Sequence, residues 1–502
     1  MGLYLCYDIR GIQSFIFRVP KLKYIIGGSA IVDRFDREIM PQLPLKTNQE
    51  HIYSAGGKGS FYCVDEDQII DLKKQIIKCA HEYGLDIRFG VNTSFSEAAK
   101  NADDLHPFIP EDLDGVPCKA SGLYPVADNK SEHAIINKRI FSDGSKMSKY
   151  FEDLFIKNIS IVPGFTGQVN FFRNVDSEGD TDGRKGANAL GNRNRWAVIC
   201  MDGNDMGQQF RYQDSLSTKL SNDDLKKWIK SMSKALDECT KEAAGAGIQH
   251  VVREWNKKAQ CENSIGNVTL PIRPIIVGGD DIVVLCHASY AMTFVKEAIR
   301  VFNEKSKSTE YTKLWQATNG ELTISAGVLY CNVHLPLHSA ILYAESLLAS
   351  AKNRGRKNVK VNQPSFASID WEQITDSIID TPAARRQREL IFKDGANKIS
   401  LTSRPCTLEE FSIIEKLAEK YEKIPATIRH KILPSLRAPF SDRLAFSASI
   451  KKNHEELFED ICDHEKYLKA SKWKIENNIQ STIVIDALML LEENARMQKE
   501  TV

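Results

Sequence analysis

Acidic side chains follow strand-like apolar segments at two points of this chain. Asp202 comes directly after the apolar residues 196–201, and Asp205 stands three residues further on. The sequence Gly-Gly-Asp-Asp at residues 278–281 lies between two more apolar segments. Because several carboxylates held close together are costly unless a cation lies among them, the pattern predicts a metal site.

Carboxylate oxygens suit Mg²⁺ or Mn²⁺, which complete their shells with water and substrate phosphates. Two such ions can lower the pKa of an attacking hydroxyl and offset charge on a leaving pyrophosphate. Gly278 and Gly279 leave room for a triphosphate. We therefore expect Asp202, Asp280 and Asp281 to be the catalytic residues of a polymerase-type palm that activates a nucleoside triphosphate.

These residues also have plainer interpretations. Gly-Gly-Asp-Asp is a common hairpin turn, because Gly and Asp are favoured there for backbone reasons. The strand that ends at Asp202, at the right place in the same order of elements, favours the metal site. Asp205 either joins that site, caps the next segment or is exposed. Lys352, near the end of a helical pattern at 344–355, is either a phosphate ligand or a lysine that complements the helix dipole.

The elements that would hold these residues follow one order that occurs twice. The first copy has predicted strands at 3–8, 52–55, 61–64 and 86–95, and predicted helices at 27–40 and 67–83. The second copy has predicted strands at 196–201, 272–277, 282–286 and 322–330, and predicted helices at 223–244 and 288–303. Each copy is a βαββαβ unit, the ferredoxin-like arrangement.

The two predicted hairpins align on their glycine pairs. The first copy has Gly-Gly-Lys-Gly at residues 56–59, where the second has Gly-Gly-Asp-Asp. The first copy has therefore lost both hairpin carboxylates. We expect it to be a degenerate palm that serves as a binding half-site.

The chain is expected to be α+β, with the two palms followed by a helical domain. Residues 1–105 form the predicted first palm and residues 195–360 the second. Residues 106–194 contain several prolines and a polar, glycine-rich stretch, which predicts a linker or insert. Residues 361–502 are predicted to be a C-terminal helical domain, with helices at 408–421, 441–450 and 481–497.

The composition is that of a globular protein, with 42% hydrophobic and 26% charged residues. Lys plus Arg number 67 and Asp plus Glu 66, so no overall positive field marks nucleic acid as an obligatory partner of the free chain. No segment is long enough to span a bilayer, and the opening residues lack the basic leader of a signal peptide. The eleven cysteines include no C-x-x-C pair, which favours reduced thiols in the cytoplasm.

The motifs resemble those of the large polymerase-like subunit of type III CRISPR effector complexes, whose second palm makes cyclic oligoadenylates from ATP. Residues 7–17, with Gly-Gly-Ser at 27–29, are similar to that family's first palm. Residues 201–207 and 278–281 are similar to its second, active palm. Arg-Pro-Cys-Thr-Leu at 404–408 is similar to the start of its C-terminal helical domain. The resemblance covers most of the chain and is most specific in the second palm.

The resemblance implies that two Mg²⁺ or Mn²⁺ ions are held in the second palm. The implied metal-binding residues are Asp202, Gly203, Asp205 and Asp281, with Asp280 adjacent. Lys352 would lie on the triphosphate. Ser29 and Ser233 either lie near the bases of two ATP molecules bound between the palms or are simply small helix residues.

The implied function is a nucleotidyltransferase that joins ATP molecules through 3′–5′ bonds and closes the ring, in antiviral defence. The implied partners are other CRISPR effector subunits together with guide and target RNA. Alternatively, the protein works alone as a homo-oligomer. Two other functions stay open: a nucleotide-binding scaffold without turnover, and a dinucleotide cyclase of the GGDEF type.

Two departures from the family affect these expectations. The family often begins with a histidine-aspartate nuclease domain, but the predicted first palm starts at residue 3 and no His-Asp dipeptide occurs. We therefore predict a form without that domain and without its DNase activity. The zinc cysteines between the palms are also missing, and Cys118 either marks a decayed zinc module or is a lone buried thiol.

Overall fold

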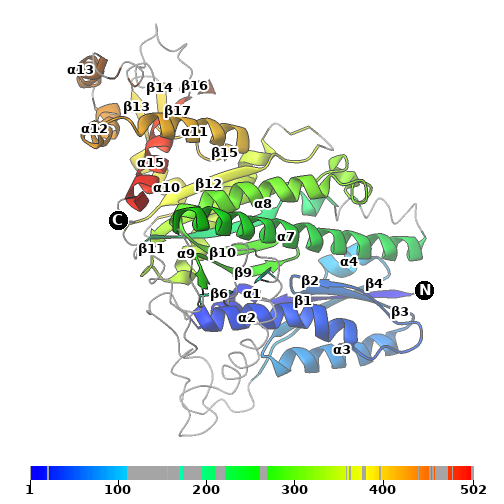
Figure 1. The fold of residues 1–502 in the computed structure, drawn as a ribbon. Coiled ribbons are helices and arrows are strands. Elements are labelled where there is room, and N and C mark those ends of the chain that lie inside the picture. The colour runs from blue at the N-terminus through cyan, green and yellow to red at the C-terminus, as the bar shows by residue number, and fades with distance from the viewer. Residues whose placement is uncertain are drawn as a thin grey trace.

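The computed structural model describes residues 2–109, 155–156, 169–172, 195–259, 268–457 and 473–498, with short gaps inside these ranges. Figure 1 shows the first palm in blue, the second palm in green beside it, and the C-terminal part in yellow to red on the far side of the second palm. Cys118 and most of the predicted linker lie outside the described residues.

The first palm is a five-stranded sheet covered by helices. In chain order its elements are β1 (Leu3–Arg10), α1 (Ile12–Ile16), α2 (Leu22–Arg34), η1 (Phe35–Ile39), η2 (Met40–Gln42), β2 (Glu50–Ala55), β3 (Lys58–Cys63), α3 (Glu66–Glu82), β4 (Asp86–Asn92), α4 (Phe95–Lys100) and β5 (Asp104–His106). The sheet order is β2-β3-β1-β4-β5. Without α4 and β5, this is the predicted βαββαβ unit.

Local sequence explains where these elements begin and which face they bury. In α3, Ile69, Leu72 and Ile76 recur at helical spacing and are all buried. The helix begins after Asp65, whose side chain accepts a hydrogen bond from the backbone N–H of Gln68. Gly84 follows the helix with a φ of +69°, a conformation that glycine adopts without strain.

The second palm repeats the arrangement with longer elements. In chain order they are β7 (Arg195–Gly203), α7 (Asn222–Ala259), β9 (Ile272–Gly278), β10 (Asp281–His287), η4 (Ala288–Tyr290), α8 (Ala291–Ser306), η5 (Gln316–Thr318), β11 (Ile324–Asn332) and α9 (Leu337–Arg356). Two further strands, β12 (Ser368–Gln373) and β15 (Cys406–Thr407), extend the sheet to the order β15-β12-β11-β7-β10-β9. Beside it, β6 (Val169–Phe171) pairs with β8 (Val268–Leu270).

The two palms share a hydrophobic core. One buried cluster joins Leu5 and Ile25 of the first palm to Val198, Leu285 and Leu347 of the second. In Figure 1, α7 runs along the boundary between the palms, close to the sheet of the first. The palms therefore form one packed body, which fixes the spacing of the residues between them.

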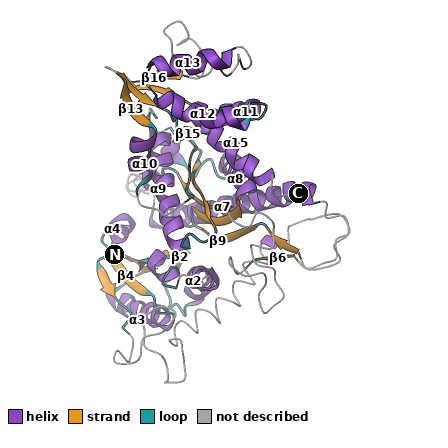
Figure 2. Cartoon of the chain, turned by 90° about the vertical axis from the view of Figure 1, so that its left-hand side faces the viewer, coloured by secondary structure: helices purple, strands orange, loops and turns teal. Residues whose placement is uncertain are grey.

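The C-terminal part contains more helix than strand. Its remaining elements are α10 (Pro382–Glu389), β13 (Ile391–Asp394), β14 (Asn397–Ser400), α11 (Leu408–Tyr421), α12 (Ala426–Arg437), α13 (Phe440–Lys451), β16 (Trp473–Glu476), β17 (Ile479–Thr482) and α15 (Val484–Gln498). Figure 2 shows the helices beside a small sheet of the order β13-β14-β17-β16. The sequence pattern missed this sheet because each of its strands has only four residues.

The α+β fold with two ferredoxin-like palms is confirmed. No helix among the described residues combines the length and apolar character needed to cross a membrane. The eight cysteines that the structure describes are all free thiols.

Candidate active site

Three carboxylates of the second palm meet where β7 ends and β10 begins. Asp202 and Asp281 are opposite each other in the antiparallel register of β7 and β10. One carboxylate oxygen each from Asp202, Asp280 and Asp281 lie within 4.8 Å of one another. The strand end and the hairpin thus bring together the three residues that the sequence predicts to be catalytic.

The close approach raises the proton affinity of the hairpin carboxylates. Burial, and then the negative charges of Asp202 and Asp281, raise the pKa of Asp280 well above its usual range. Burial and the charge of Asp202 raise the pKa of Asp281 to about 7. Asp281 as a whole is exposed at the tip of the hairpin. Its carboxyl group, however, lies at the wall of the cavity with protein around it. Without a cation, the cluster holds protons that it would release on binding one.

Lys352 provides a positive charge in contact with this cluster. Its ammonium group lies 2.5 Å from Oδ2 of Asp202, and it comes from the last two turns of α9. The lysine also lowers the pKa of Asp281. The helix-dipole interpretation of Lys352 therefore does not account for its position, because the side chain reaches the carboxylates.

Glycines allow the strand end and the hairpin to approach this closely. A Cβ atom on Gly203 would lie 3.0 Å from Cβ of Asp280, and the N–H of Gly203 donates to the carbonyl of Asp280 at 3.2 Å. Gly279 has a φ of +61°, and its carbonyl accepts a hydrogen bond from Oγ1 of Thr240 on α7. The hairpin is thereby fixed to the long helix that borders the cavity.

The structure does not bring Asp205 together with the other predicted metal-binding carboxylates. Asp205 is buried, and the three carboxylates that lie together do not include it. Its two oxygens accept hydrogen bonds from the N–H and hydroxyl of Ser365 and from the amide of Gln208. The carboxylate is therefore a structural acceptor that anchors the turn after β7.

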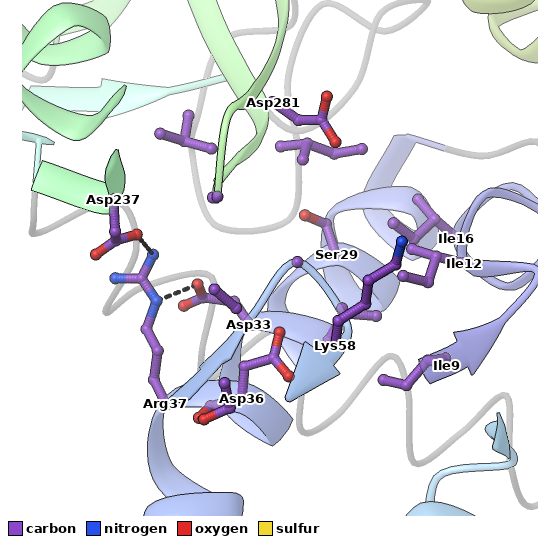
Figure 3. Close-up of a pocket in the computed structure, with 18 of the residues that line it drawn as sticks. Ile9, Ile12, Ile16, Ser29, Asp33, Asp36, Arg37, Lys58, Asp237 and Asp281 are labelled. Carbon is purple, nitrogen blue, oxygen red and sulfur yellow. Dashed lines mark hydrogen bonds and ion pairs between the residues drawn. The ribbon is translucent and has the colours of Figure 1, made fainter. Parts of the chain in front are cut away.

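A cavity of about 830 Å³ opens between the two palms, beside the carboxylate cluster. Asp281 lines it together with Gly278 and Gly279, and Ser29 and Ser233 line it from α2 and α7. Figure 3 shows Asp281 on the second-palm hairpin and Ser29 below it on the first palm. Both serines thus line the cleft between the palms.

Charged residues that sequence reasoning missed also line this cavity. Arg37 of η1 contacts Asp33 at 2.5 Å and Asp237 of α7 at 3.0 Å, so it connects the palms by ion pairs. Glu345 of α9 faces the cavity and raises the pKa of Asp281. Lys58 lines it from the opposite hairpin. No motif marks these residues, because they become neighbours only when the two palms pack together.

The donor set fits a hard divalent cation. Three carboxylates within 4.8 Å, beside a cavity of this size, offer oxygen ligands and leave room for water and phosphate. Burial and neighbouring negative charge raise the pKa values of Asp280 and Asp281, and a bound cation would offset that charge. Asp202, Asp280 and Asp281 together form the group of carboxylates that could hold such a cation.

Residues 195–360 match the family described as Cas10/Cmr2, second palm domain. This segment is similar to the Cas10/Cmr2 second palm domain. The resemblance to the polymerase-like subunit of type III CRISPR complexes is thereby confirmed in the segment that carries the carboxylates. A search of curated protein sequences found no match.

Solved structures of this family extend the likeness beyond the second palm. A chain of the Csm1–Csm4 cassette in complex with cA3 matches with a TM-score of 0.55 and 15% identity, covering 98% of this chain and 69% of that chain. The apo Csm1–Csm4 cassette matches with a TM-score of 0.51 and 15% identity, covering 98% of this chain and 70% of that chain. At this identity the similarity establishes the fold, from the first palm to the C-terminal part.

Proposed function

We propose that this chain is a nucleotidyltransferase that converts ATP into cyclic oligoadenylates. The observation that carries the proposal is the meeting of Asp202, Asp280 and Asp281 beside the cleft between the palms, which Asp281 lines. A cleft of about 830 Å³ is large enough for nucleotides, and residues of both palms line it. The first palm would hold one nucleotide while the second activates another.

Each residue has a proposed part in the reaction. Asp202 and Asp281 hold the divalent cations, with Asp280 adjacent. Bound Mg²⁺ or Mn²⁺ would activate the attacking 3′-hydroxyl and offset charge on the leaving pyrophosphate. Lys352 exchanges its contact with Asp202 for a triphosphate oxygen, and Gly278 and Gly279 admit the phosphates. Ser29 and Ser233 lie near the two bases.

The proposed setting is a type III CRISPR effector complex in the cytoplasm. The structurally similar proteins were crystallised as Csm1–Csm4 cassettes, one of them in complex with cA3. We propose that this chain likewise binds a Csm4-like subunit and acts with guide and target RNA. A homo-oligomer that works alone is the alternative arrangement.

Pyrophosphate release from ATP tests the proposal directly. The protein should release pyrophosphate with Mg²⁺ or Mn²⁺, alone or once guide and target RNA and partner subunits are added, and mass spectrometry should detect cyclic adenylates. Asp281→Asn should lower the rate by at least about 100-fold, because it removes a metal ligand. The matched control is Asp67→Asn, on the exposed first turn of α3.

Other outcomes would favour the other functions. Absence of product under all these conditions, with ATP still bound, would favour a nucleotide-binding scaffold. A guanine dinucleotide from mixed nucleotides would favour a cyclase of the GGDEF type. Unchanged turnover by Asp281→Asn would show that the chemistry occurs elsewhere.

A further inference from the structure

A second cavity lies in the C-terminal part of the chain. Its volume is about 430 Å³, and it shares no lining residue with the cleft between the palms. Its walls come from β12 of the second-palm sheet and from the helices α10, α12 and α15. Small-molecule sites usually measure roughly 300–1,000 Å³. The cavity therefore has room for a ligand that the proposed palm chemistry does not use.

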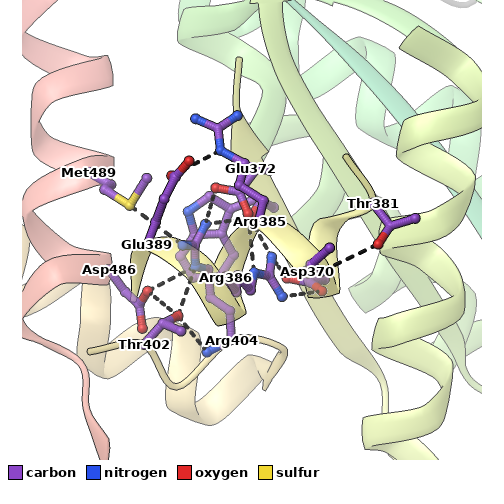
Figure 4. A network of polar contacts seen from close by, with 12 residues as sticks. Asp370, Glu372, Thr381, Arg385, Arg386, Glu389, Thr402, Arg404, Asp486 and Met489 are labelled. Carbon is purple, nitrogen blue, oxygen red and sulfur yellow. Dashed lines mark hydrogen bonds and ion pairs between the residues drawn. The ribbon is translucent and has the colours of Figure 1, made fainter. Parts of the chain in front are cut away.

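The charged side chains that line this cavity are mostly arginines. They are Arg385 and Arg386 of α10, Arg429 and Arg437 of α12, and the carboxylates Glu372 and Glu389. Arg385 pairs with Glu389 at 3.1 Å, and Arg386 pairs with Asp370 and Glu372 at 2.7 and 3.1 Å. Figure 4 shows these ion pairs. The two arginines of α10 are therefore already neutralised by protein.

The two arginines of α12 have no such counter-charge. Among the residues that the structure describes, neither Arg429 nor Arg437 forms an ion pair, and Arg437 donates one hydrogen bond, to the carbonyl of Arg388 at 3.5 Å. Nη1 of Arg429 is buried and has no hydrogen-bond partner there. A buried donor that stays unsatisfied is costly, and a bound ion often satisfies it. The cavity is thus suited to an anion that accepts a hydrogen bond from Arg429.

Apolar side chains complete the lining of the cavity. They are Leu390, Leu433, Ile485 and Leu488, with Met489 beside them on α15. Small-molecule sites commonly combine an apolar lining with a few charged groups that fix the orientation of the ligand. A ligand with one anionic group and a less polar body fits this lining better than an inorganic anion does.

We propose that this cavity binds a phosphate monoester, whose phosphate oxygens accept hydrogen bonds from Arg429 and Arg437. A phosphate monoester carries a charge of roughly −1.5 to −2 at pH 7, so it offsets two guanidinium groups, whereas a carboxylate offsets one. Guanidinium groups also match the geometry of phosphate oxygens. The monoester is either a free small molecule or the terminal phosphate of an RNA, because the recognised group is the same in both.

Calorimetry on the full chain in EDTA tests this site with AMP as the probe. The unaltered protein should bind AMP, and Arg429→Met should weaken that binding at least about tenfold, the loss expected for one charge-assisted hydrogen bond. Arg429→Lys keeps the charge and should retain part of the affinity. The matched control is Lys431→Ala, which alters an exposed residue of the same helix outside the cavity lining.

The melting temperature of the ligand-free protein separates binding from a structural role of Arg429. Arg429→Met keeps the apolar stem and removes a buried nitrogen that has no partner, so its melting temperature should not fall below that of the unaltered protein. A fall of several degrees, absent in Lys431→Ala, would mean that Arg429 supports the fold, and it would overturn the proposal.

Two oligoribonucleotides, one with and one without a 5′-phosphate, distinguish the sources of the monoester. AMP binding that Arg429→Met weakens supports a free small molecule. Tighter binding of the phosphorylated oligonucleotide, lost in Arg429→Met, supports an RNA end. If Arg429→Met bound AMP and the phosphorylated oligonucleotide as the unaltered protein does, or if neither probe bound at all, the proposal would be overturned. Pyrophosphate release from ATP is a separate measurement, since Arg429 does not line the cleft between the palms.

Discussion

The ammonium group of Lys352 donates a hydrogen bond to Oδ2 of Asp202 at 2.5 Å. The lysine thereby partly balances a cluster of three carboxylates. A divalent cation bound to the carboxylates would neutralise their negative charge in place of Lys352. The ammonium group of Lys352 would then be free to bind a phosphate oxygen. The contact thus connects metal binding to triphosphate binding through one side chain.

Replacing Lys352 should affect metal binding and triphosphate binding in opposite directions. Lys352→Met removes the positive charge beside the carboxylates, so Mn²⁺ should bind severalfold more tightly. Turnover should fall on the order of 100-fold, because the lysine no longer meets the triphosphate. Calorimetric Mn²⁺ titration and pyrophosphate release measure the two effects. Arg356→Met, at the exposed end of the same helix, is the control. Weaker Mn²⁺ binding by Lys352→Met than by the unaltered protein would contradict this account.

Asp36 should make the stability of the protein depend on pH. Burial is the largest cause that raises its pKa, to about 7, although the N–H of Gly57 at 2.6 Å and the hydroxyl of Tyr7 at 3.0 Å donate to it. Between about pH 4, the usual pKa of an unfolded carboxyl, and about 7, the native state holds a proton that the unfolded state has released. Stability from this group is therefore present at low pH and lost as the pH rises through about 7.

Asp36→Asn should reduce that dependence. Its amide is neutral, so it imitates the protonated acid, with the oxygen facing Gly57 and the NH₂ group facing Tyr7. The free energy of unfolding should fall by up to about 4 kcal/mol from pH 4 to 8 in the unaltered protein, and by less in the variant. Urea denaturation across this range is the measurement. An equal slope in both proteins would assign the dependence to other groups.

The ion pairs of Arg37 should stabilise the contact between the palms. Arg37→Ala leaves Asp33 and Asp237 without their shared partner, so we expect the free energy of unfolding to fall by roughly 1–3 kcal/mol. Arg34→Ala is the matched control, because among the residues that the structure describes Arg34 pairs only with the more exposed Glu38 on the same helical segment. Its loss should cost at most about 0.5 kcal/mol. Equal losses in urea denaturation would mean that the contact with Asp237 adds nothing.

The sequence predicts those site residues whose positions are fixed by elements of one palm, and it misses those whose partners lie far along the chain. Asp202, Asp280 and Asp281 could be predicted, because strand ends and a glycine hairpin fix their positions within one palm. Asp205 could not, since its partner Ser365 is far along the chain and takes up both carboxylate oxygens. Arg37 and Lys58 acquire their significance only from the packing of the palms. The small C-terminal sheet escaped prediction because a four-residue strand has too few alternations to show a period.

A buried charge network joins the last helix to the sheet of the second palm. The side chains of Arg404 and Asp486 are both fully buried and lie 2.8 Å apart, and Arg404 also donates to the carbonyl of Trp371 on β12. Arg386 pairs with Asp370 through two hydrogen bonds, of 2.9 and 2.7 Å. Figure 4 shows Arg404 beside Asp486 of α15, and Arg386 of α10 beside Asp370 of β12. The network fixes α15 against β12 through charges that water does not reach.

Arg404→Met should therefore be strongly destabilising. It keeps much of the side-chain volume but leaves Asp486 buried without its counter-charge, which costs about 3–5 kcal/mol. Adding Asp486→Asn removes the uncompensated charge, so the double variant should recover part of the loss. Arg388→Met, whose exposed side chain pairs with Asp380 and Glu389, should cost less than about 1 kcal/mol. Urea denaturation measures all of these variants. If the double variant were no more stable than Arg404→Met, the loss would come from packing against Trp371 and not from the unpaired charge of Asp486.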